Sequence, residues 1–229
     1  MEQLNFIQTI TIGDDAFKVI DSDVLLTLNR FGRGRFLIEA QEKPSQGLVK
    51  FVSGYKGRNS TQWLTGFIES VVEVEQNQWR VFCRELSAVY YSICPIALRN
   101  VSLTEVTKAL FDLKSVGFSA PDMPYSKTKA ACFNSWDRGL DAIEQLGRVF
   151  SIDDFVWYLQ DDQSIFVGSH KDSIFNGHDF PIARSAFKQL TSMDGILGLV
   201  PGLRPGFSVN QKRIQQVRIK NENMVLEWF

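Results

Sequence analysis

Along the first ninety residues, short apolar runs alternate with polar positions and with clusters of turn residues, a pattern typical of β-strands. The pattern predicts strands over residues 4–12, 23–29, 36–40 and 48–55. Gly32-Arg33-Gly34-Arg35 precedes the third run, and because no helix follows it we expect a strand connection with exposed arginines rather than a dinucleotide loop.

A hairpin is predicted from Trp63 to Arg84, with Gln76-Asn77 as its two-residue turn. This register places one set of side chains on a common face: Ile68, Ser70, Val72, Val74, Trp79, Val81 and Cys83. On the other face it sets two pairs of opposite charge across the strands, Glu73–Arg80 and Glu69–Arg84. Cross-strand pairs of this kind contribute about 0.2–1 kcal/mol each.

The pattern changes to helical spacing after residue 93. Ser102 and Glu105 have the spacing of a capping box, and Gly117 is expected to end the helix that they begin. The apolar positions of this helix are Leu103, Val106, Leu110 and Leu113. A second helix is expected from near Ser135, with Leu140, Ile143 and Leu146 on one face.

A second hairpin follows, with strands over residues 155–160 and 164–168. Past His178 the pattern is irregular until three strand-like pieces, residues 207–209, 214–219 and 224–229, close the chain. The fold class is therefore α+β. We expect a β domain at residues 1–92, an α/β insertion at residues 93–176 and a C-terminal β segment at residues 177–229.

Charge and composition exclude several classes of protein. The 25 basic and 26 acidic residues give a net charge of −1, so the overall basic footprint of a nucleic-acid binder is missing. No apolar stretch is long enough to span a membrane, and the first five residues do not resemble a secretory signal. We interpret Cys83, Cys94 and Cys132 as reduced core residues of a protein made in a cytoplasm.

Candidate catalytic residues are few. His170 and His178 are expected in surface loops, and Cys94 is expected to be a buried apolar side chain. The acidic doublets fall where turns are predicted, and Asp favours turns; they are Asp14-Asp15, Asp153-Asp154 and Asp161-Asp162. We therefore predict no catalytic, cofactor-binding or metal-binding residue, and no enzyme activity.

One stretch of the chain is distinctly basic. Between Gly195 and Asn221 there is no acidic residue, and the basic residues are Arg204, Lys212, Arg213, Arg218 and Lys220. They could form a basic rim that contacts an acidic partner or a phosphate backbone. They could equally be a solvated strand face whose charge is balanced by acids elsewhere.

Taken in order, these pieces resemble the baseplate hub (late-control, tail-protein-D-like) proteins of tailed bacteriophages and related contractile injection devices. Three stretches carry the resemblance. The first is the long charged hairpin from Gln62 to Leu86. The second contains the two helices, at 101–106 and 134–143, and the hairpin at 155–168. The third, at 203–209 and 214–217, resembles the return from the insertion into a barrel. The chain stops at Trp228-Phe229, earlier than is usual in the family, so we expect no complete second barrel and no spike or lysozyme appendage.

The resemblance implies a tail-tube-like β-barrel, an inserted helix–helix–hairpin unit and C-terminal strands that complete a barrel, either this first barrel or a reduced second one. It implies a homotrimeric ring at the distal end of the tail tube, through which DNA passes without specific binding. The implied partners are tail tube or distal tail protein, tape measure protein, and tail-tip or fibre proteins, in a virion made in the cytoplasm of a bacterial host. The interface candidates are Glu69, Glu73, Arg80, Arg84, Arg204, Arg213 and Arg218.

Two other functions stay open at this point. The first is a nucleic-acid-binding β-barrel that uses exposed aromatic side chains and the basic C-terminal stretch, with affinity that falls as salt rises. The second is a wall-degrading hydrolase with Asp or Glu as acid and base, although the sequence offers no discernible pair of carboxylates for it.

Overall fold

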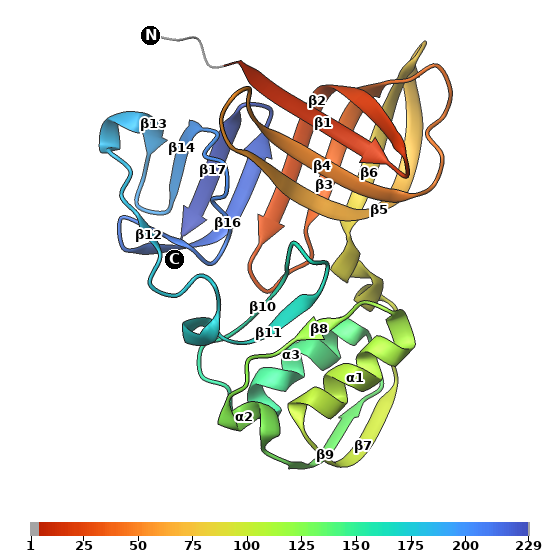
Figure 1. Cartoon of the computed structure of the whole chain (residues 1–229), viewed down its shortest axis with the longest axis vertical. Coiled ribbons are helices and arrows are strands. Elements are labelled where there is room, and N and C mark those ends of the chain that lie inside the picture. The colour runs from red at the N-terminus through yellow and green to blue at the C-terminus, as the bar shows by residue number, and fades with distance from the viewer. Residues whose placement is uncertain (1–4, 229) are drawn as a thin grey trace. The chain divides into compact units, whose positions relative to one another are not determined.

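The computed structural model describes residues 5–228 and consists mostly of β-strands, with a few helices (Figure 1). The chain divides into two compact units. The first, here called the sheet unit, contains the chain up to Glu85 and from His178 onward; the second, the insertion unit, runs from Leu86 to Gly177. The sequence pattern predicts these divisions at residues 92 and 176.

The strands of the sheet unit come from both ends of the chain. The N-terminal strands are β1 (Phe6–Ile12), β2 (Asp15–Thr27), β3 (Arg33–Glu39), β4 (Leu48–Tyr55), β5 (Ser60–Glu75) and β6 (Gln78–Glu85). The C-terminal elements are β12 (Asp179–Phe180), the short 3-10 helix η3 (Arg184–Ala186), β13 (Phe187–Leu190), β14 (Asp194–Gly198), β15 (Ser208–Val209), β16 (Lys212–Lys220) and β17 (Asn223–Trp228).

These strands form one sheet, paired in the order β1-β4-β5-β6-β3-β2-β16-β17-β14-β13, with β15 beside β16 and β12 beside β15. β1 pairs with β2 as well as with β4, so the pairing of the six N-terminal strands returns to its first strand. The length of β2 makes this possible: Lys18 is opposite Thr9 of β1, whereas Leu26 is opposite Val217 of β16.

Alternation of inward and outward side chains builds much of the core of the sheet unit, as the burial pattern of β3 shows. Phe36 and Phe51 are fully buried, and their ring centroids lie 4.7 Å apart. The expected loop at residues 32–35 is wrong, because all but its first residue belong to β3. Gly34 faces inward, where a Cβ atom would come within 2.5 Å of the Phe36 ring, so its glycine makes room for an aromatic side chain.

The charged hairpin forms, and Glu75 is opposite Gln78 as predicted, but the register beyond that pair is wrong. One bulge between Glu73 and Glu75 and another between Ile68 and Ser70 each insert an extra residue into β5. Glu73 is consequently opposite Trp79, and Val72 is opposite Arg80. Val72 and Val74 are 54% and 40% exposed instead of facing the core.

The expected C-terminal strands are confirmed as β15, β16 and β17. The region past His178 is more ordered than expected, since β13 and β14 extend the sheet there. β14 pairs with β17, with Leu197 opposite Met224. Two ends of predicted strands, Leu4 and Phe229, lie outside the described residues.

The insertion unit contains η1 (Leu86–Tyr91), β7 (Ile96–Val101), α1 (Leu103–Lys114), β8 (Phe118–Ser119), α2 (Pro124–Lys127), β9 (Ala130–Ser135), α3 (Gly139–Val149), β10 (Phe155–Leu159), β11 (Ile165–Ser169) and η2 (His170–Asp172). β10, β11 and β8 form one small sheet, and β7 and β9 form another. The hairpin predicted at residues 155–168 is confirmed as β10 and β11.

Local signals predict the helices of this unit well. The capping box of α1 is confirmed: the Ser102 side chain accepts from the Glu105 amide, and the Glu105 carboxylate accepts from the Ser102 amide. The helix ends at Ser115, in the left-handed conformation with φ of 59°, rather than at Gly117. α3 begins at Gly139 rather than near Ser135, because the preceding residues pair with β7 as a strand.

Candidate functional site

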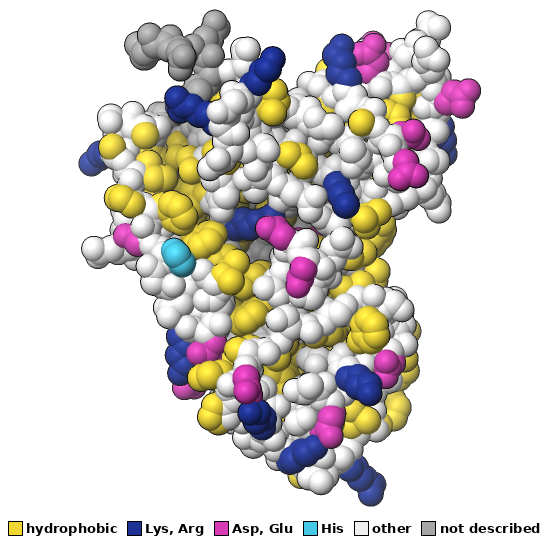
Figure 2. All heavy atoms as spheres, viewed as in Figure 1, with side chains coloured by type: hydrophobic (Ala, Val, Ile, Leu, Met, Phe, Trp, Pro, Cys, Tyr) yellow, Lys and Arg dark blue, Asp and Glu magenta, His cyan; other side chains and the backbone are white. Residues whose placement is uncertain are grey.

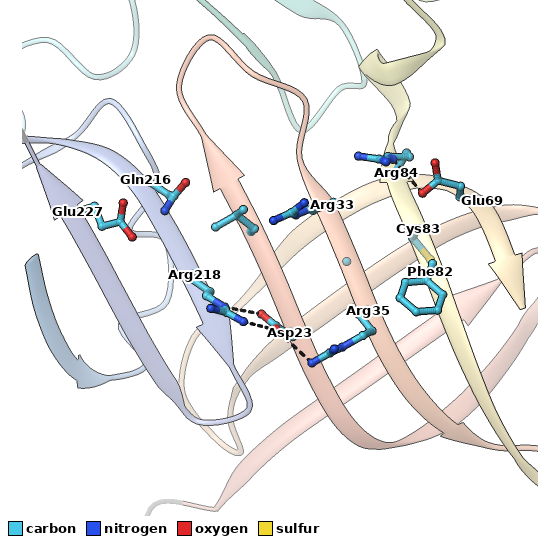
Figure 3. Close-up of a pocket in the computed structure, with 12 residues that line it drawn as sticks. Asp23, Arg33, Arg35, Glu69, Phe82, Cys83, Arg84, Gln216, Arg218 and Glu227 are labelled. Atoms are coloured by element: carbon cyan, nitrogen blue, oxygen red, sulfur yellow. Dashed lines mark hydrogen bonds and ion pairs between the residues drawn. The ribbon is translucent and has the colours of Figure 1, made fainter. Parts of the chain in front are cut away.

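A hollow of about 510 Å³ lies on the solvent-facing side of the sheet unit, opposite the core (Figure 3). Its lining comes from β2, β3, β5, β6, β16 and β17, which are distant in sequence and adjacent in the sheet. We call it the arginine groove and define it by four guanidinium groups and three carboxylates: Arg33, Arg35, Arg84, Arg218, Asp23, Glu69 and Glu227.

Strand register places the arginines beside one another. In one row across the sheet, Arg84 of β6 is opposite Arg33 of β3, Arg33 is opposite Leu25, and Leu25 is opposite Arg218 of β16. In the next row, Arg35 is opposite Asp23 of β2. Because neighbouring strands lie about 4.8 Å apart, these charged groups share one continuous surface.

Asp23 is the electrostatic centre of the groove, with only 11% of its side chain exposed. Its two carboxylate oxygens accept from Nε and Nη2 of Arg218, at 2.8 and 2.7 Å, in a bidentate pair. Arg35 approaches the same carboxylate at 3.4 Å. The hydrogen bonds from Arg218 lower the pKa of Asp23, although its partial burial acts in the opposite direction.

The base of the charged hairpin forms the opposite wall of the groove. Glu69 is the residue that the bulge inserts into β5, and its carboxylate accepts from Nε of Arg84 at 2.9 Å. This ion pair confirms the predicted Glu69–Arg84 contact, although Phe67 is the residue directly opposite Arg84. Burial, and secondarily the charge of Glu69, raises the pKa of the Cys83 thiol to about 12, so the thiol stays protonated.

Arg33 differs from the other arginines of the groove. It is exposed and makes no ion pair within the described part of the chain. It stands directly opposite Arg84, and like charges in that position repel each other. The β3 side of the groove therefore has an excess of positive charge that an acidic ligand would neutralise.

The structure brings together three of the seven predicted interface residues. Glu69, Arg84 and Arg218 line the groove. Glu73 and Arg80 lie farther along the hairpin, and among the described residues no ion pair joins them because the bulge shifts the register. The remaining two, Arg204 and Arg213, lie outside the groove.

Three of the five basic residues of the C-terminal stretch make contacts in different places. Arg218 is paired with Asp23, which favours the interpretation of a strand face balanced by acids elsewhere. Arg204 donates to the Gln62 carbonyl and lies 5.9 Å from the centroid of the Trp63 ring. Lys212 lies 5.3 Å from the centroid of the Trp228 ring.

Charges of both signs are also interspersed on the face of the molecule that Figure 2 shows. The acidic doublets lie at or beside turns, as predicted, and the described residues hold no cluster of three or more His, Cys, Asp or Glu placed for a metal ion. No helix among the described residues is long and apolar enough to cross a membrane. Cys83 and Cys94 are buried, but Cys132 is exposed, so its expected place in the core is wrong.

Sequence reasoning missed four of the seven residues that define the arginine groove: Asp23, Arg33, Arg35 and Glu227. The sequence pattern predicts Arg33 and Arg35 only as exposed arginines of a connection, although their alternation with Gly34 and Phe36 is a signal for a two-faced strand. Asp23 carries no such signal, because its partner Arg218 is 195 residues away in sequence.

No protein-family model matches this chain. Among the solved structures that share its fold are three from tail and secretion proteins. The 43 kDa tail protein of prophage MuSo2 from Shewanella oneidensis has a TM-score of 0.69 at 7% identity, with 96% of this chain and 97% of that chain covered. The tail protein from Neisseria meningitidis MC58 has a TM-score of 0.67 at 8% identity, with 98% and 96% covered.

The third is an Escherichia coli component of the type VI secretion system, described as similar in structure to the T4 bacteriophage tail proteins gp27 and gp5. Its TM-score is 0.66 at 11% identity, with 97% of this chain and 76% of that chain covered. The fold is therefore that of bacteriophage tail proteins and a related secretion component, which confirms the resemblance that the sequence indicated.

A curated relative comes from Haemophilus phage HP1, an uncharacterized 58.7 kDa protein in the lys 3' region. It is 26% identical to this chain over 223 residues. The alignment covers 97% of this chain, which spans 42% of the length of that relative.

Proposed function

We propose that the chain is a non-enzymatic structural component of a bacteriophage tail. The observation that carries this proposal is the likeness to tail proteins over nearly the whole chain, with both units included. The relative from a bacteriophage supports the same context. In this role the protein is made in the cytoplasm of the bacterial host and becomes part of the virion.

More narrowly, we propose a baseplate hub protein whose copies form a trimeric ring at the distal end of the tail tube. β2 pairs with β1, the first of the six N-terminal strands, and this supports a tail-tube-like barrel in the sheet unit. The C-terminal strands extend the same sheet. DNA and the tape measure protein would pass through the ring. The tail tube or distal tail protein, and tail-tip or fibre proteins, would be its neighbours.

The balance of charge suits this role. A lumen through which DNA passes without tight binding needs a surface that is not continuously basic. In the groove, Arg84 and Arg218 are paired with acids of the same chain, which lowers the net positive charge. Mixed charges on strands at a subunit boundary instead favour specific contact with a partner of complementary charge.

Labelling with gold-coupled antibodies in electron micrographs tests this proposal. Antibodies raised against the purified chain are applied to tail particles from the phage or lysogen that encodes it. Label at the distal end of the tail tube is the expected result. Intact tails that carry no label anywhere would overturn the proposed role.

The nucleic-acid-binding alternative needs a separate measurement, because Arg33 is available for a phosphate. Fluorescence anisotropy with labelled single- and double-stranded oligonucleotides at about 50 mM salt should show no salt-dependent binding. Binding that falls steeply with added salt would favour the alternative over the hub.

A further inference from the structure

The tip of the charged hairpin presents two carboxylates that have no ion-pair partner in the part of the chain that the structure describes. β5 pairs with β4 only as far as Phe67, so the hairpin beyond that residue is held by β6 alone. Glu73 and Glu75 are both exposed there, and neither makes an ion pair within the described part of the chain. Val72, between them and the base of the hairpin, is 54% exposed.

The arginine groove presents the complementary charge. Arg33 repels Arg84 across the strands and pairs with no acid among residues 5–228, and Arg35 shares Asp23 with Arg218. The remaining carboxylate, Glu227, belongs to β17, which is three strands from β3, or about 14 Å at the usual strand spacing. An acidic group that enters near Arg33 therefore meets guanidinium groups first.

The two surfaces of one chain cannot meet each other. Glu69 at the base of the hairpin lines the groove, and Glu75 lies six residues farther along the same strand. An extended strand spans about 20 Å over that distance, so the tip is held away from its own groove. The acidic tip consequently needs the groove of another molecule.

We propose that Glu73 and Glu75 at the hairpin tip of one copy dock beside Arg33 and Arg35 in the arginine groove of the next copy. Such a contact joins different surfaces of the two copies, and contacts of that kind generate closed rings when the rotation between copies closes. This contact rests on the proposed ring and identifies the residues that join its neighbours.

Charge reversal with compensation tests the contact. The tip variant is Glu73→Arg with Glu75→Arg, the groove variant is Arg33→Glu, and the combined variant carries all three changes. Arg33→Glu is chosen because Arg33 makes no ion pair within the described residues. The folding of the chain therefore does not depend on the charge of Arg33. Sedimentation equilibrium of the full chain at about 50 mM salt measures association, where screening is weak.

Two control variants match these changes in charge at exposed positions elsewhere on the sheet unit. Asp14→Arg with Asp15→Arg matches the tip variant, and Lys56→Glu matches the groove variant. Circular dichroism and denaturant unfolding establish that every variant is folded, so a loss of association is not a loss of structure.

The tip variant and the groove variant should each associate at least about tenfold more weakly than the unchanged chain, and the combined variant should recover most of the loss. The controls should associate normally. Association that neither charge reversal weakens would overturn the contact. A combined variant that associates no more strongly than the tip variant or the groove variant would also overturn it. An unchanged chain that stays monomeric at every concentration would overturn it as well.

Two outcomes distinguish this contact from a phosphate-binding groove and from a failure of the tail role. Oligonucleotide binding that Arg33→Glu abolishes, with association unaffected, would assign the groove to a phosphate ligand instead. Gold label at the tail tip together with charge-independent association would overturn the contact and leave the proposed tail role intact, whereas unlabelled tails would overturn the role itself.

Discussion

The sheet unit contains contacts between residues much farther apart in sequence than any that the insertion unit contains among the described residues. In the sheet unit, the ion pair at the centre of the arginine groove joins Asp23 to Arg218, 195 residues apart. In the insertion unit, the capping box of α1 joins Ser102 to Glu105, three residues apart. The candidate site therefore belongs to the part of the molecule whose contacts close the longest loops.

The largest expected effect comes from the core beneath the arginine groove. Phe36→Ala would leave a cavity against Phe51 and should lower the free energy of unfolding by about 3–5 kcal/mol. Phe111→Ala on α1 of the insertion unit is the matched control, because that ring is 45% exposed and its loss should cost about 1 kcal/mol or less. Denaturant unfolding measures both, and equal losses would contradict the packing described for β3.

The next effect tests the long-range ion pair. Asp23→Asn removes the carboxylate that binds Arg218 and Arg35, and should cost about 1–2 kcal/mol at neutral pH after allowance for partial exposure. Glu227→Gln, in the same groove, makes a matched control because Glu227 has no ion pair among the described residues; its cost should stay within about 0.5 kcal/mol.

The pH dependence of the same pair has a definite sign. Hydrogen bonds from Arg218 lower the folded-state pKa of Asp23 below 3.8, so its contribution to stability is present above that value and is lost as pH falls through the folded-state pKa. The difference in unfolding free energy between the unchanged chain and Asp23→Asn should therefore shrink on acidification. A difference that grew as the pH fell would contradict the pairing.

A smaller effect is expected from the local cap in the insertion unit. Ser102→Ala removes the side chain that accepts from the Glu105 amide, and should cost about 1 kcal/mol. Ser102→Thr retains the hydroxyl and serves as the control. Hydrogen exchange of the α1 amides should increase in the alanine variant only; unchanged exchange would mean that the cap contributes little.

The smallest expected effect is a gain in stability. Ser115 ends α1 with φ of 59°, a conformation that glycine adopts more readily than serine. Ser115→Gly should therefore raise the thermal midpoint slightly, by an amount equivalent to about 0.5 kcal/mol. A lower midpoint would show that the serine side chain is more important than the backbone strain.

The contrast in contact range explains how far the sequence can predict this protein. Signals within a few residues, such as the capping box at Ser102 and the alternation in β16, lead directly to the observed elements. The hairpin register could not be predicted, because a bulge such as the one at Glu69 depends on the sheet that the strand joins. Most of the arginine groove could not be predicted, because its residues come together only when β2 lies between β3 and β16 in the sheet, and the sequence does not reveal that strand order.

Electron cryomicroscopy of purified tail tips is the measurement that addresses the proposed role most directly. We predict three copies of the chain around a hollow axis at the end of the tube, with the strands of each sheet unit beside those of its neighbours. Tail tips of complete particles in which this chain is absent, or is present as a single copy away from the axis, would contradict the account.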